Sequence, residues 1–216
     1  MFTGFSPETI DFLWGIRMNN NRDWFLEHKK QYVDTLYQPM KELGAQLFEP
    51  FLQRQGDILK VSRIYRDARL HHPDPYKESL WASIRRDGEW WAENPTLFFE
   101  IRPDGVNYGF SLWHPKVAAM EAFRNRITAK PEEFLQMLHG VQDAVGMEVT
   151  AQCYKRPKEA PTPELQPYFT WKTDIDLIVH EDVGDAIFGP ELGSRVGAFL
   201  QKLIPLYDYF NFITLG

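Results

Sequence analysis

Three arginines at three-residue spacing are the residues in this sequence best suited to bind a ligand. Arg63, Arg66 and Arg69 lie in the segment SRIYRDARL, residues 62–70, around a single aspartate, Asp67. A guanidinium group is planar and presents its N–H donors in a fork that fits a carboxylate or a phosphate. On an extended chain, alternate side chains point to opposite sides, so both sides of this segment carry arginine. The spacing therefore predicts arginines that need either an acidic partner or a bound anion.

The neighbouring residues extend this candidate site. Aromatic rings at two tyrosines can stack on a ligand, a lysine adds positive charge, and the aspartate can orient an arginine or act as a base. We expect the ligand-binding residues to be Arg63, Tyr65, Arg66, Asp67, Arg69, Tyr76 and Lys77. Two interpretations stay open, because these arginines can also pair with carboxylates from distant segments. The sequence identifies no catalytic residue, so it leaves open whether the protein is an enzyme.

Positive charge is concentrated in this part of the chain. The whole sequence has 24 Lys and Arg against 30 Asp and Glu, a net charge of −6. Residues 60–86 contain seven Lys or Arg and three Asp or Glu, so this segment carries +4 and the remainder −10. A chain that is acidic overall does not adhere generally to nucleic acid or to anionic membranes. We therefore expect a small anionic ligand as the partner, and neither nucleic acid nor membrane.

A second pattern that can do chemistry lies near the C-terminus. Asp174, Asp176, His180 and Asp182 alternate along DIDLIVHED, which suits a divalent metal or the solvated face of an outer strand. The alternation by itself favours the strand face. The sequence has no HExxH, GxxxxGK[ST], GxSxG or CxxC motif. We predict no metal site and no cofactor.

The lone cysteine and the hydropathy of the chain indicate a compartment. Cys153 has no second cysteine with which to form an intramolecular disulfide, which is compatible with a reducing cytoplasm. The N-terminal residues MFTGFSPETIDF lack the basic start and apolar run of a signal peptide. No stretch reaches the ~18 apolar residues of a membrane span. We expect a soluble cytoplasmic protein.

Helix signals are found in both halves of the chain. Ser6 and Pro7 start a helix, because serine accepts hydrogen bonds from the first amides and proline fits the first turn. Asn20 or Asn21 is expected to cap a long second helix with an apolar stripe up to Phe51 and a kink at Pro39. Further helices are predicted over residues 116–127, over residues 131–145 and from residue 190 onward.

Strand signals separate these helices. Strands are predicted at residues 58–65, at 173–182 and in a β-hairpin over 96–112 whose turn is Pro103-Asp104-Gly105. The small residues Asn107, Gly109 and Ser111 share one face of that hairpin, which admits close approach of a helix or a ligand. HHPDPYK, residues 71–77, is expected to be a loop, and SLWASIRRDGEWW, residues 79–91, a short helix or irregular turn.

The arrangement of these elements predicts the fold class. Helices and strands segregate without regular βαβ alternation. We therefore predict an α+β fold, a single domain over residues 1–216 with an antiparallel sheet and several packed helices.

Several of these segments carry a family resemblance. The ordered motifs GFSPETIDFL, NNNRDWFLEHKKQY, RIYRDARL, PYK and YGF followed by Trp113 resemble the bacterial domain-of-unknown-function family 2461. The similarity runs from Phe2 to about Phe123 and more loosely to the C-terminus. It implies a single α+β domain and supplies no mechanism. Where the family usually reads RDVRF and DKTPYK, this chain has RDARL and HHPDPYK, so it lacks the ring after Arg69 and the loop lysine.

Three functional classes follow from these observations, and the acidic remainder of the chain counts against the third, which is sequence-independent binding of nucleic acid through the basic segment and its aromatic residues. The first is a protein with a basic pocket that binds a small anionic or phosphorylated ligand, and we adopt it as the prediction. The alternative is a protein–protein interaction module without catalytic activity, with Trp81, Trp90 and Trp91 as its contact patch. The oligomeric state is open in each case.

Overall fold

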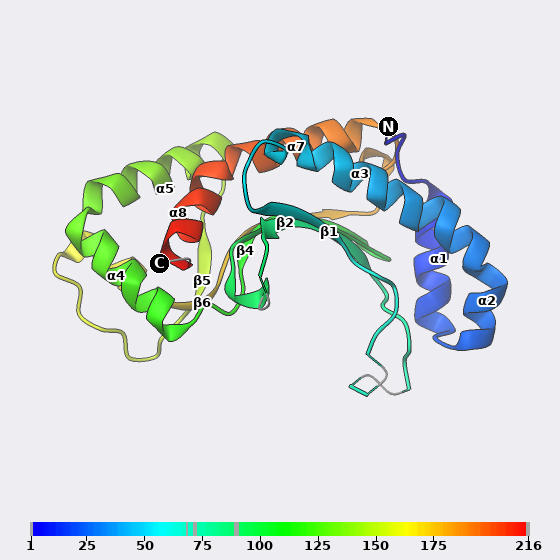
Figure 1. The fold of residues 1–216 in the computed structure, drawn as a ribbon, viewed down its shortest axis with the longest axis horizontal. Coiled ribbons are helices and arrows are strands. Elements are labelled where there is room, and N and C mark those ends of the chain that lie inside the picture. Colours follow the sequence, from blue (N-terminus) through cyan, green and yellow to red (C-terminus); the bar gives the residue numbers. More distant parts are fainter. Residues whose placement is uncertain (1, 68, 71–72, 89–90, 215–216) are drawn as a thin grey trace. The chain divides into compact units, whose positions relative to one another are not determined.

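One six-stranded antiparallel sheet and several helices make up the fold (Figure 1). The computed structural model describes residues 2–67, 69–70, 73–88 and 91–214. The strands, in the spatial order β1-β2-β3-β4-β6-β5, are β1 (Asp57–Val61), β2 (Leu80–Arg86), β3 (Thr96–Arg102), β4 (Gly105–Leu112), β5 (Thr150–Cys153) and β6 (Trp171–Asp182). The helices are α1 (Pro7–Met18), α2 (Arg22–Gln31), α3 (Gln38–Phe48), α4 (Val117–Ala129), α5 (Pro131–Val145), α6 (Gln166–Phe169), α7 (Glu191–Lys202) and α8 (Ile204–Thr214). The predicted fold class, α+β with an antiparallel sheet and packed helices, is confirmed.

Contacts along the backbone group the chain into two compact units. Unit 1 comprises Met1–Ile84, Phe98–Tyr108 and Val179–Ala198, and unit 2 comprises Arg85–Leu97, Gly109–Ile178 and Phe199–Gly216. Strands β2, β3, β4 and β6 contribute residues to both units. The extent of the single domain, residues 1–216, stays a prediction. None of the helices among the described residues combines the length and the apolar character needed to cross a membrane.

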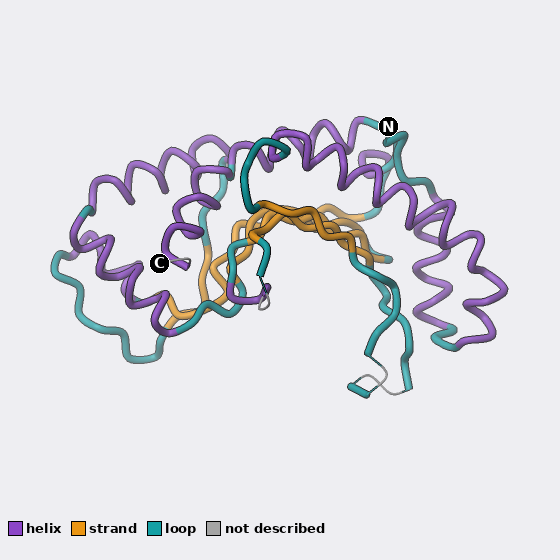
Figure 2. Tube along the Cα trace, viewed as in Figure 1, coloured by secondary structure: helices purple, strands orange, loops and turns teal. Residues whose placement is uncertain are grey.

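The first helices start where the sequence predicts. Ser6 and Thr9 form a capping box at the start of α1, and the Asn21 side chain caps α2 by accepting from the Trp24 amide at 3.0 Å. Before Pro39, where we expected a kink, the helical hydrogen-bond pattern changes. A π-helical segment, Tyr32–Tyr37, joins α2 to α3 without a break (Figure 2). Because proline has no N–H to donate, a helix running into it needs a local change of hydrogen bonding, and the wider π turn provides one.

Within the segment that we expected to be a short helix or irregular turn, residues 80–86 form strand β2, so the prediction is wrong for these residues. Leu80, Ala82 and Ile84 are buried, and Ala82 lies beside Gly44 of α3. The alternate residues Trp81 and Ser83 project to the other side, which is the pattern of a strand covered on one face. Burial of Ser83 and Arg85 on the polar side hides this alternation from the sequence, because both residue types are usually exposed.

The sheet has an apolar face and a polar face. On β4 the residues Val106, Tyr108, Phe110 and Leu112 are buried on the apolar side, as the hairpin pattern predicts. In unit 1, the apolar faces of β1 and β2 pack against α3, where Gly44 lies close to Leu59, Val61 and Ala82. The polar face of unit 1 carries Ser79, Glu100, Arg102, Asn107 and His180, which are half-buried or exposed.

Aromatic rings fill the core of unit 2. Phe123 packs against Phe134 at a centroid distance of 5.4 Å, against Trp171 at 5.7 Å and against Phe210 at 5.4 Å. Phe110 of β4 also contacts Phe210, at 5.9 Å. Large rings bury the most area per residue, so the high aromatic content of this chain is used for packing here.

Gly109 allows close approach of the neighbouring strand β6. Its φ of +151° lies in the region that favours glycine. A Cβ at this position would overlap the carbonyl oxygen of Leu177 on β6. The missing side chain therefore lets β6 approach β4.

Gly109→Ala should destabilise the protein by more than about 1 kcal/mol, since it adds both backbone strain and a clash with Leu177. Gly140→Ala is the matched control: Gly140 lies in α5 with no atom within 4 Å of the added Cβ, so its free energy of unfolding should be unchanged or rise by up to ~1 kcal/mol. Urea denaturation followed by circular dichroism measures both. Equal stability of the two variants would contradict this role of Gly109.

Candidate functional site

A short antiparallel ribbon positions two of the predicted ligand-binding residues. We call it the basic ribbon, residues 62–67 and 73–79. The Arg66 amide donates to the Pro75 carbonyl at 2.9 Å, and the Lys77 amide donates to the Ile64 carbonyl at 2.7 Å. A bridge between Tyr65 and Tyr76 lies between these two bonds. Residues on one face of an antiparallel pair alternate on both strands, so Arg66 and Lys77 project to the same side.

The two tyrosines of the predicted site hold the basic ribbon in place. Tyr76 is buried and stacks on Phe25 of α2 at a centroid distance of 4.4 Å, and Tyr65 meets the same ring edge-on at 5.7 Å. Burial raises the pKa of the Tyr76 hydroxyl, with a smaller contribution from Tyr65. Asn20 donates to the Tyr76 carbonyl and accepts from its amide, each at 3.0 Å. These contacts tie the ribbon to the turn between α1 and α2.

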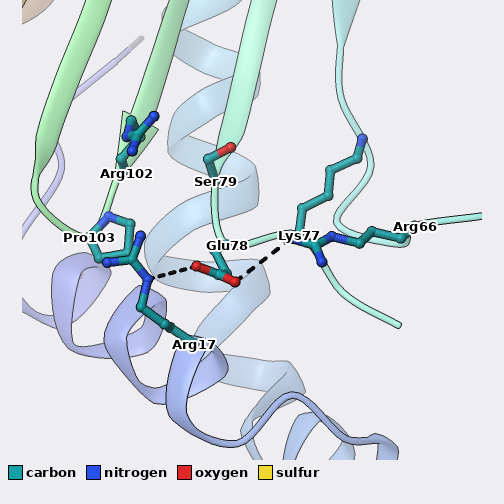
Figure 3. A pocket seen from close by; sticks show the side chains of 7 residues that line it. All are labelled: Arg17, Arg66, Lys77, Glu78, Ser79, Arg102 and Pro103. Carbon is teal, nitrogen blue, oxygen red and sulfur yellow. Dashed lines mark hydrogen bonds and ion pairs between the residues drawn. The ribbon is translucent and has the colours of Figure 1, made fainter. Parts of the chain in front are cut away.

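A pocket of about 210 Å³ lies where the basic ribbon, α1 and the β3–β4 turn meet within unit 1 (Figure 3). Arg17 comes from the last turn of α1, and Ser79 directly precedes β2. The complete lining is Arg17, Arg66, Lys77, Glu78, Ser79, Arg102 and Pro103. We call this the basic pocket, because four of its seven lining side chains are cations and one is an anion.

Glu78 is the carboxylate that two arginines of the pocket, Arg17 and Arg66, share. Arg17 donates from Nε to Oε2 of Glu78 at 2.7 Å. Arg66 approaches the other oxygen, Oε1, at 3.7 Å, which is close enough for an ion pair and too long for a hydrogen bond. Each guanidinium has five N–H donors, so these contacts engage a small part of their capacity. Glu78 orients both groups and offsets one of the four positive charges.

Lys77 lies in a strongly positive environment. Burial lowers the pKa of its ammonium group, and the charges of Arg63 and Arg66 lower it further. Its Nζ lies 5.7 Å from the centre of the Trp81 ring, and Figure 3 shows its amino end directed away from Glu78. A bound anion would relieve this repulsion, because it favours the charged form of the amine.

Arg102 is the fourth cation and has its own acidic neighbour. Its Nε donates to Asp104 at 3.1 Å, and both side chains are substantially exposed. This hydrogen bond raises the pKa of Arg102 and lowers the pKa of Asp104. An exposed pair of this kind contributes little stability, so it can rearrange around a ligand.

The structure separates the other members of the predicted site from the pocket. Arg69 and Asp67 pair with each other, with Arg69 donating from Nε at 3.0 Å and from a terminal nitrogen at 2.7 Å. Arg63 is exposed and is outside the pocket lining, although its charge acts on Lys77. Of the seven predicted ligand-binding residues, Arg66 and Lys77 line the pocket.

Sequence reasoning missed five of the lining residues: Arg17, Glu78, Ser79, Arg102 and Pro103. Glu78 and Ser79 directly follow the PYK segment, so their position was a usable signal. Arg17 is 61 residues from its partner Glu78, and Arg102 lies at the end of β3. No local pattern brings those two arginines to the ribbon.

The sequence offered further candidates for metal binding and for protein interaction. Among the described residues, no three His, Cys, Asp or Glu side chains gather as a metal site would require. Burial and the neighbouring Asp174 raise the pKa of Asp176, while a hydrogen bond with Ser111 opposes the shift. His71, His72 and Trp90 lie outside the described residues. Trp81 is half-buried beside Lys77, and the interaction-module alternative stays a prediction.

Together the fold and this pocket define an α+β protein with a cluster of basic side chains around one carboxylate. Residues 8–209 match the family described as "Conserved hypothetical protein (DUF2461)", and the chain belongs to this family. The match confirms the resemblance seen in the ordered sequence motifs. A search of curated proteins found no match to the chain.

Asn20→Ala should destabilise the protein by about 1–3 kcal/mol, because it leaves the amide and carbonyl of Tyr76 without their partners. Asn19→Ala is the control, since Asn19 makes an exposed bond to Gly15, and its effect should be within about 0.5 kcal/mol. Thermal and urea unfolding of the two variants give the comparison. If Asn19→Ala proves the more damaging change, the Asn20 contact does not anchor the ribbon.

Proposed function

We propose that the basic pocket binds a small anionic ligand, with a phosphoryl group as its preferred partner. The observation that carries this proposal is that four basic residues, Arg17, Arg66, Lys77 and Arg102, line one pocket that holds a single carboxylate, Glu78. Like charges repel, so this arrangement is costly without a counter-ion. A bound dianion offsets that cost, and the arginine forks and the lysine supply charge-assisted hydrogen bonds to it.

The size of the pocket limits what it takes. Sites for drug-sized molecules enclose roughly 300–1,000 Å³. At about 210 Å³ this pocket is smaller, so it fits a phosphate group or a carboxylate-bearing fragment and not a large ligand as a whole. The rest of a larger ligand would extend out of the pocket.

The proposal includes a location in the cytoplasm. It is supported by the single cysteine in the sequence and by the lack of any helix among the described residues that could cross a membrane. Phosphorylated metabolites are abundant in that compartment. No step of bond making or breaking is proposed.

Arg66→Gln should weaken the binding of inorganic phosphate roughly ten- to a hundredfold, because a hydrogen bond to a charged group is worth ~1.5–3 kcal/mol. Arg69→Gln is the matched control: it changes a neighbouring arginine that pairs with Asp67 outside the pocket, so its affinity should equal that of the wild type. Isothermal titration calorimetry at two salt concentrations measures both. Equal losses in the two variants would reject the pocket as the binding site.

The pKa of Lys77 should rise when phosphate binds. In the ligand-free protein it is lowered by burial and by Arg63 and Arg66. An adjacent dianion favours the charged amine, so the pKa rises and binding is tighter below it than above it. Arg66→Gln should also raise the pKa without ligand, since it removes one repelling charge. Nuclear magnetic resonance of 13C-methylated lysines follows the titration, and a Lys77 signal that is insensitive to phosphate would contradict the proposal.

A further inference from the structure

A chain of hydrogen bonds crosses the polar face of the sheet in unit 1 and begins at the basic pocket. Ser79, which lines the pocket, donates to Oε1 of Glu100 on β3 at 2.6 Å. Asn107 on β4 donates from Nδ2 to Oε2 of the same carboxylate at 3.3 Å. The Asn107 Oδ1 lies 2.7 Å from Nδ1 of His180 on β6. All four residues belong to unit 1.

The direction of these bonds fixes the tautomer of His180. An ionised carboxylate only accepts hydrogen bonds, so Asn107 must turn its amide nitrogen toward Glu100. Its oxygen then faces His180, and the Nδ1 of His180 must carry the hydrogen. In the neutral imidazole the other nitrogen, Nε2, therefore has a lone pair that accepts a hydrogen bond.

His180 is exposed, so a ligand can reach the lone pair on its Nε2. Holding an exposed side chain in one orientation costs conformational entropy and buries little apolar surface in return. The hydrogen bond to Asn107, and not apolar packing, therefore holds this histidine, and it leaves Nε2 accessible to a ligand.

The chain of hydrogen bonds also gives the distance across the sheet between Glu100 and His180. Glu100, Asn107 and His180 lie on three neighbouring strands, β3, β4 and β6. Adjacent strands are separated by about 4.8 Å, so His180 lies roughly 10 Å across the sheet from Glu100. Ser79 links Glu100 directly to the basic pocket.

We propose that His180 is a second anchor for the ligand of the basic pocket, accepting a hydrogen bond at Nε2 from a hydroxyl or amine of that ligand. This inference rests on the proposed function, since it takes the phosphoryl group to lie among Arg17, Arg66 and Lys77. The ligand class is then a phosphate monoester whose phosphorus lies beside Ser79, three strand spacings or roughly 14 Å from His180. Its hydrogen-bond donor lies roughly 11 Å from the phosphorus atom, because a hydrogen bond to Nε2 covers about 3 Å of that distance. Asn107 is a positioning residue, because it acts through His180.

Three probes test this assignment: inorganic phosphate, hexyl phosphate and hydroxyhexyl phosphate. The last two differ only in a terminal hydroxyl. The wild type should bind hydroxyhexyl phosphate roughly three- to tenfold more tightly than hexyl phosphate, the range of one neutral hydrogen bond. His180→Phe keeps a flat ring without a lone pair, so it should abolish this difference and leave phosphate binding unchanged. His139→Phe, which changes an exposed histidine of α5, should retain the difference.

The outcomes separate the two proposals. If phosphate binds but the wild type does not prefer the hydroxylated ester, or His180→Phe retains the preference, the role of His180 is overturned and the basic pocket survives. If none of the three probes binds, both proposals fail. A long-range 1H–15N correlation spectrum adds a readout of structure: His180 should be protonated at Nδ1 in the wild type and lose this preference in Asn107→Ala. An Nε2-protonated His180 in the wild type would also overturn the inference.

Discussion

The contact of one carboxylate, Glu78, with two arginines is the interaction on which the candidate site depends. Arg17 of α1 and Arg66 of the basic ribbon approach different oxygens of this carboxylate, at 2.7 and 3.7 Å. Without the Glu78 carboxylate, the positive charges of Arg17, Arg66 and Lys77 would repel one another with no negative charge among them. With it, two of them are oriented toward a common point while an excess of positive charge remains. Glu78 therefore orients two of the basic side chains and leaves the pocket with a net positive charge.

The difference between the two faces of the sheet determines where chemistry is available. The apolar faces of β1 and β2 pack on α3 in unit 1, and buried residues such as Phe99, Ile101 and Val106 continue this face on β3 and β4. The opposite face carries the polar row from Ser79 to His180. Because side chains alternate along every strand, the packing that fixes the apolar face also fixes the polar row. The proposed second anchor thus follows from the same constraint that forms the core.

Local signals in the sequence were sufficient for much of the fold. The proline and glycine of the hairpin turn, the caps Ser6 and Asn21, and the Pro131–Val145 helix appear in the structure where they were predicted. Strand β2 was missed because polar residues are buried on its second face. Strand β5 was missed because its residues are mostly exposed, and such a strand has no hydrophobic pattern.

The site was less accessible to sequence reasoning than the fold. Arg66 and Lys77 were identified because basic residues cluster locally, but clustering does not distinguish a pocket residue from Arg69, which pairs with Asp67 two positions away. Arg17 joins the pocket through a contact between distant segments, which depends on how α1 docks beside the ribbon. The most direct test of the central claim is a crystal structure with tungstate, whose anomalous scattering identifies the bound anion. Anion binding in the basic pocket predicts a peak within hydrogen-bond distance of Arg17, Arg66 or Lys77. Peaks confined to other surfaces, or a pocket without one, would contradict it.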